Sequence, residues 1–90
     1  MITQAITNDT TVKQLCEGFG CWKAMVDSMA AGESGVLAIE RWVIGYFADG
    51  LVALQCGSVL ESSLMAQHMA AGTIYRDGRK TAGRGQEAMV

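Results

Sequence analysis

The chain has no proline, only one histidine and few charged side chains. Without proline, nothing in the chain forces a helix to break, and a composition rich in leucine, methionine and alanine favours helices. Hydrophobic residues make up 50% of the 90 positions, which is enough for the core of one small domain. We expect the remaining apolar surface to be buried in a homodimer or against another protein.

The charges are few and unevenly distributed. Residues 1–72 carry seven acidic against three basic side chains, whereas residues 73–90 carry four basic against two acidic ones. A protein that binds nucleic acid needs a basic face for the phosphates, so the acidic body makes nucleic acid an unlikely partner class. We therefore divide the chain into a helical domain, 1–72, and a flexible, polar, glycine- and arginine-containing tail, 73–90, with its four bases solvated.

The first ten residues, MITQAITNDT, contain neither the basic nor the apolar region of a signal peptide. Three cysteines, an odd number, fit a reducing compartment better than a disulfide framework. We expect a cytoplasmic protein, or a periplasmic one if a signal peptide has been removed, with residues 1–9 as an irregular arm.

The longest apolar run is GVLAIERWVIGYFADGLVAL, residues 35–54. It is long enough to cross a membrane, but Glu40, Arg41 and Asp49 would each cost about 2.5–3.5 kcal/mol at the bilayer centre. Apolar residues recur within it at three- and four-residue steps, which predicts a buried core helix and no membrane span. In an alternative interpretation the helix ends at Asp49-Gly50 and a new segment begins there.

Two further helices flank this stretch. Apolar residues keep a helical period from Val12 to Met29, although glycines at 18 and 20 weaken that helix and favour a kink or break. Ser58 and Glu61 form the Ser-x-x-Glu capping pattern, which predicts a third helix over 59–71 that Gly72 ends. The predicted fold class is all-α, a bundle of three, or with a break four, helices.

Gly45 and Gly50 lie inside the predicted central helix, where each costs about 0.5–1 kcal/mol relative to alanine. Such glycines are typical of close packing between two helices. They would equally leave a gap in which a small apolar ligand lies against the helix face.

The three cysteines are candidates for one disulfide. Cys16 and Cys21 on one continuous helix would point about 140° apart, so they could neither bridge each other nor share a metal ion. Cys56 could reach either of them, and buried free thiols are the alternative that we favour. His68 is the single imidazole and lies between methionines, so we predict no metal, no cofactor and no catalytic site, and hence no enzyme.

Five aromatic residues complete the candidate interaction site. In an antiparallel helix pair they could form one cluster, with Trp42 at its edge as an interface anchor or, equally, covered in the core. They are Phe19, Trp22, Trp42, Tyr46 and Phe47.

The stretch WVIGYFADG, residues 42–50, follows a cysteine in an earlier segment and contains a W-x-x-G-Y pattern. It resembles small periplasmic helical proteins of the HdeA-like acid-stress chaperone group and the related immunity proteins. The resemblance implies a non-enzymatic protein that binds unfolded or toxic partners. This chain departs from that group because the second glycine comes one residue late and no cysteine follows Cys56.

We therefore predict a non-catalytic protein–protein interaction module, such as a small inhibitor, immunity or adaptor protein, that associates with itself. The alternative is a helical bundle that binds a small apolar ligand near Gly45 and Gly50.

Overall fold

The structure, a computed structural model, describes residues 2–48 and 50–74. Within these residues strands and helices follow one another in the order β1 (Ile2–Ile6), α1 (Asp9–Phe19), α2 (Trp22–Ala30), β2 (Gly35–Ile39), β3 (Trp42–Phe47), β4 (Gly50–Cys56) and α3 (Val59–Ala71).

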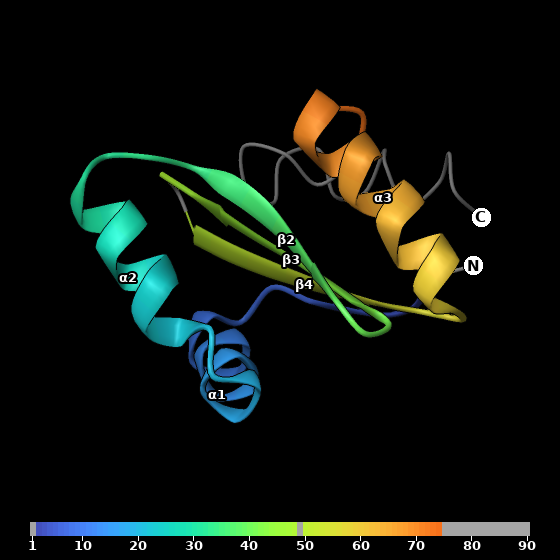
Figure 1. The fold of residues 1–90 in the computed structure, drawn as a ribbon, viewed down its shortest axis with the longest axis horizontal. Helices are drawn as coiled ribbons and strands as arrows, with labels where there is room; N and C mark the ends of the chain where they lie inside the picture. Colours follow the sequence, from blue (N-terminus) through green and yellow to red (C-terminus); the bar gives the residue numbers. More distant parts are fainter. Residues whose placement is uncertain (1, 49, 75–90) are drawn as a thin grey trace.

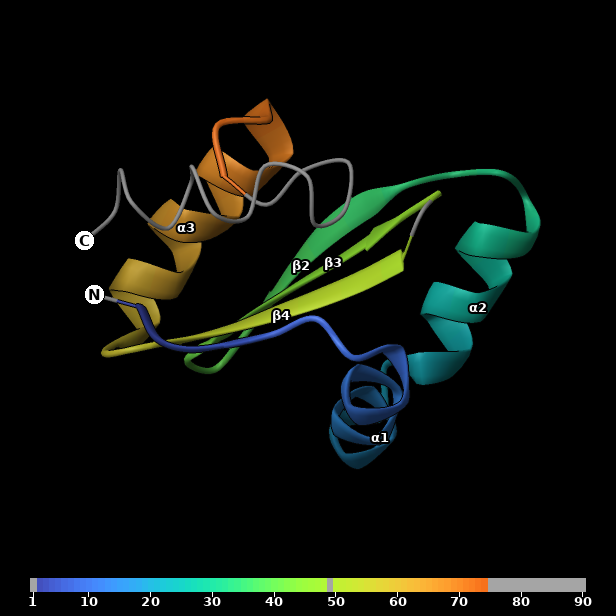
Figure 2. The ribbon, with the colours of Figure 1, turned by 180° about the vertical axis from the view of Figure 1, so that it is seen from behind.

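The strands form one antiparallel sheet with the spatial order β1-β4-β3-β2. Strands β2, β3 and β4 follow one another as a meander, and β1 joins at the free edge of β4. Helices α1 and α2 cover one face of the sheet, and α3 covers the other face (Figures 1 and 2). The molecule therefore has three layers, with the sheet in the middle.

The predicted all-α helical bundle is wrong: the protein is a mixed α/β domain. The apolar run that we interpreted as one core helix is the β2–β4 meander, with a two-residue turn at Glu40-Arg41 between β2 and β3, and with Phe47 and Gly50 paired where β3 and β4 adjoin. A strand covered on both faces has apolar residues at successive positions, and this obscures the alternation that normally identifies strands.

Burial on both faces is visible in two separate hydrophobic clusters. One lies between the sheet and α3, and its buried members are Val43, Phe47, Val52, Leu54, Cys56, Met65, Met69 and Ile74. The other lies between the sheet and the helices α1 and α2, and its buried members are Val12, Cys16, Met25, Ile44, Leu51 and Ala53. Neighbouring residues of β3 and β4 alternate between the two clusters, as the two-residue period of a strand requires.

The helical predictions outside this stretch are largely confirmed. Helix α3 spans the predicted residues, with the Ser58 hydroxyl accepting from the Glu61 amide at 3.1 Å and Gly72 at φ 84° as its C-cap. The first predicted helix breaks at Gly20, whose φ of 80° is left-handed, and α1 and α2 are separate helices. Asn8 caps α1, its side chain accepting from the Thr11 amide at 3.0 Å.

The irregular N-terminal arm is also wrong, because residues 2–6 pair with β4. The predicted tail falls almost entirely on residues 75–90 and so lies outside the described residues. Ile74, just before them, is buried in the α3 cluster. No helix of the described part of the chain has the length and hydrophobicity that a bilayer crossing requires.

Candidate functional site

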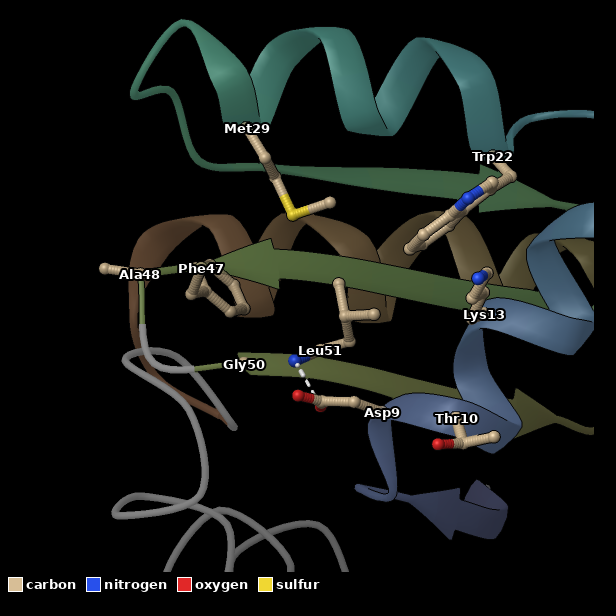
Figure 3. Close-up of a pocket in the computed structure, with 9 residues that line it drawn as sticks. All are labelled: Asp9, Thr10, Lys13, Trp22, Met29, Phe47, Ala48, Gly50 and Leu51. Carbon is tan, nitrogen blue, oxygen red and sulfur yellow. Dashed lines mark hydrogen bonds between the residues drawn. The ribbon is translucent and has the colours of Figure 1, made fainter.

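A groove of about 470 Å³ opens between α1, α2 and the adjoining ends of β3 and β4 (Figure 3). Trp22 and Met29 come from α2 on one side, and Leu51 lies on the sheet opposite them. The first turns of α1 supply the polar wall, and Ala48 and Gly50 line the end of the groove next to β3 and β4. The remaining lining residues are Asp9, Thr10, Lys13, Phe47, Ala48 and Gly50.

The polar wall of the groove is held in place by specific contacts. The Leu51 amide donates to a carboxylate oxygen of Asp9 at 3.0 Å, which ties the start of α1 to β4. The Lys13 ammonium lies 5.6 Å from the centre of the Trp22 ring, within the range of a cation–π interaction. An apolar floor with one cation and one carboxylate at its rim suits a small amphipathic molecule.

The outer face of α3 is the second candidate surface. Helices that cover a sheet normally expose polar side chains, but Leu60 is 84% exposed, Val59 60% and Leu64 50%. A shallow groove of about 520 Å³ runs between Leu60 and Leu64 and is bordered by Ser58, Glu61, Ser63 and Gln67. Leucines left in water on a folded surface are typical of an interaction site.

The structure gathers four of the five predicted aromatic residues on one face of the sheet. Phe19, Trp22, Trp42 and Tyr46 are partly buried against the α1/α2 cluster. Phe47 belongs to the opposite cluster, beneath α3, because it is one position out of step with Tyr46 along β3. Trp22 alone of the four lines the groove of Figure 3.

The two glycines of the predicted gap lie in different surroundings. A Cβ atom on Gly45 would lie 2.6 Å from the Met69 sulfur and 2.6 Å from the Phe47 ring, so β3 and α3 are in close contact there. Gly50 begins β4 with a φ of 146°, a conformation that favours glycine, and lines the groove.

The three cysteines are free thiols, and the sheet separates Cys56 from the other two. Because the chain reverses at Gly20, the assumption of one continuous helix does not apply to Cys16 and Cys21, which are close to each other: the Cys21 thiol donates to the Cys16 carbonyl at 3.6 Å. Burial raises the pKa of the Cys16 thiol to about 12, and the neighbouring Cys21 adds to the shift. Burial also raises the pKa of Cys56.

Sequence reasoning missed both surfaces for identifiable reasons. The groove depends on α1 and α2 being separate, and Gly20 was the available signal for that break. The sequence does contain a signal for the apolar outer face of α3, since this helix of 13 residues carries only Glu61 and His68 as ionisable side chains. His68 sits near the C-terminus of α3, with its Nδ1 3.3 Å from the Thr73 hydroxyl.

Comparison with known protein families, with curated proteins and with solved structures finds no match to this chain. The resemblance to HdeA-like proteins stays a prediction, but its motif residues, Trp42–Phe47 and Gly50 among them, lie in the β3–β4 hairpin and not in a helix. Among residues 2–48 and 50–74, no three side chains of His, Cys, Asp or Glu are grouped so that they could hold a metal ion.

Proposed function

We propose that this protein is a non-catalytic protein–protein interaction module that associates with a second copy of itself through the outer face of α3 and the adjoining edge of the sheet. The observation that carries the proposal is the exposure of Leu60, at 84%, on a helix that also exposes Val59 and Leu64. Neighbouring apolar side chains left exposed to water are typical of an interaction site.

The exposed leucines lie in the first half of the helix. Leu60 and Leu64 are exposed one turn apart, the polar Gln67 follows at i+7 and Ala71 at i+11, while Met65 and Met69 face the sheet. Covering a leucine side chain contributes about 1.5–3 kcal/mol. In a two-fold dimer both copies bury the same leucines, so the contribution of each leucine counts twice, and a few such residues support a stable complex.

The sheet edge next to α3 supports a second copy as the partner. Helix α3 lies chiefly over β2 and β3, and β2 is the edge strand on that side. Its sequence, GVLAI, has no charge, no proline and no register shift against β3, whereas the opposite edge strand, β1, has an irregularity between Ile2 and Gln4. Natural sheets protect exposed edge strands with charged residues, proline or bulges, and an edge strand without these features is suited to pairing with another strand.

The test is the mass of the protein by light scattering across a dilution series. We expect a dimer in the wild type and a dissociation constant at least tenfold higher for Leu60→Glu, because a charge would replace a buried leucine. Leu60 is so exposed that the variant should keep its fold. Val26→Glu is the matched control, since Val26 is 38% exposed on α2, beyond the other face of the sheet.

A wild-type mass of one chain at every concentration would refute self-association. An equal effect of Leu60→Glu and Val26→Glu would show that α3 is not the interface.

The groove of Figure 3 favours a second candidate function, the binding of a small amphipathic ligand. Its volume of about 470 Å³ falls within the range of small-molecule sites. In a Trp42→Phe variant, Trp22 is the only tryptophan and reports directly on the groove. A ligand in the groove should shift its emission, and Met29→Glu should abolish that shift.

A further inference from the structure

Three sulfur-containing side chains lie close together where α1 meets α2. The Cys16 sulfur lies 3.4 Å from the Met25 sulfur, and the Cys21 thiol donates to the Cys16 carbonyl oxygen at 3.6 Å. Cys16 is in the last turns of α1, Cys21 is the N-cap of α2, and Met25 follows one turn later on α2. The left-handed Gly20 reverses the chain and so brings the three together.

We propose that Cys16, Cys21 and Met25 form a binding site for a soft monovalent metal ion of the Cu(I) class. Thiolate and thioether sulfurs are the ligands that select Cu(I). Harder ions need oxygen or nitrogen ligands, and within residues 2–48 and 50–74 no group of three His, Cys, Asp or Glu side chains is placed to supply them.

The distance between the Cys16 and Met25 sulfur atoms fits such an ion after a small adjustment. Three sulfurs at a metal–sulfur distance of about 2.3 Å lie about 4 Å apart in a trigonal arrangement. The Cys16–Met25 distance of 3.4 Å must therefore widen by about 0.6 Å to reach that separation. The thioether of Met25 has three rotatable bonds and can make that movement within the core.

Burial and access are also suitable for a metal that must be kept from water and oxygen. Cys16 is 0% and Met25 1% exposed, whereas Cys21 is only partly buried and provides the entry. On binding, each thiol that becomes a ligand releases its proton to solvent as the metal–sulfur bond forms, and no electron is transferred. Two thiolates and one Cu(I) ion give the site a net charge of −1.

The test is an anaerobic titration with Cu(I), kept reduced by ascorbate, in competition with a chromophoric Cu(I) chelator. We expect one ion per chain and an X-ray absorption spectrum with only sulfur ligands. Cys21→Ser should lower the affinity more than about 100-fold, because even partners that merely orient a metal ligand contribute roughly 10- to 100-fold. Met25→Leu should cause a smaller loss of roughly tenfold, because its thioether is a neutral ligand.

The chain contains matched controls for both substitutions. Cys56→Ser removes a buried thiol on the far face of the sheet, and Met29→Leu removes the next methionine on α2, so both should bind Cu(I) as the wild type does. Far-UV circular dichroism verifies the fold of each variant. Cys21→Ser is the main variant because serine is a good N-cap and the site is partly exposed.

The proposal is overturned if the wild type does not compete with the chelator, or if folded Cys21→Ser and Met25→Leu bind as tightly as the wild type. It is equally overturned if Cys56→Ser abolishes binding, since the ion would then lie elsewhere.

Discussion

Replacement of Gly45 by alanine tests the contact between β3 and α3, on which the α/β arrangement depends. The new Cβ would lie 2.6 Å from the Met69 sulfur, 2.6 Å from one ring atom of Phe47 and 3.0 Å from another. The methionine can move aside, but the buried Phe47 ring has little room. Overpacking of this kind costs about 1–3 kcal/mol, and the stiffer unfolded chain returns about 0.4–1 kcal/mol.

We therefore expect Gly45→Ala to lower the free energy of unfolding by about 1–2 kcal/mol. Urea unfolding followed by circular dichroism measures this directly, and for a domain of this size the melting temperature should fall by roughly 4–16 °C. Gly18→Ala is the matched control: its Cβ meets nothing within 4 Å, and helix propensity predicts a gain of up to about 1 kcal/mol.

A double-mutant cycle locates the clash. If the Phe47 ring obstructs the new methyl group, Gly45→Ala should cost less when combined with Phe47→Leu than alone. A Gly45→Ala variant as stable as the wild type would refute the close contact of Gly45 with Met69 of α3 and with the Phe47 ring.

Two further predictions concern single residues. Folding raises the pKa of the Cys16 thiol from 9.0 to about 12, so the thiol ionises at lower pH in the unfolded chain than in the folded one. The free energy of unfolding should therefore fall by up to about 1.4 kcal/mol per pH unit between pH 9 and 12. Urea unfolding at several pH values should show a smaller decline for Cys16→Ala, and an unchanged slope would contradict the burial of the thiol. Glu40 has a φ of 52° in the β2–β3 turn, a conformation that glycine adopts more readily. Glu40→Gly should therefore raise the free energy of unfolding by about 1 kcal/mol, measured as a higher melting temperature. A lower melting temperature would mean that the turn does not hold this conformation.

Local chemistry accounts for the elements that were predicted correctly. Helix α3 was predicted from Ser58, Glu61 and Gly72, whose side chains and backbone act on amides and carbonyls within a few residues. The break in the first helix had the same kind of signal, because Gly20 adopts a left-handed conformation that most residues avoid. Such effects need no information from distant parts of the chain.

The strands could not be predicted in this way. Val36, Ile39 and Val43 are three or four residues apart and fit a helix face, but they equally belong to strands that are apolar on both sides. One signal that separates the two periods is the turn at Glu40-Arg41, on either side of which Ile39 and Trp42 pair with each other. The β-branched and aromatic residues of this stretch favour strands, and in the folded protein this preference prevails over the helical spacing.

The sequence by itself determined the helix over 59–71 with both of its ends, the break near Gly20, and that apolar side chains exceed what one helix face can bury. Tertiary structure decided the rest. Strand β1 exists because Ile2–Ile6 pair with β4, about fifty residues later in the chain. The apolar segments of β3 and β4 are strands because helices cover both faces of the sheet (Figure 1). The groove at Trp22 and the proposed metal site at Cys16, Cys21 and Met25 likewise combine residues from separate elements. A pattern along the sequence cannot specify the distances between such residues.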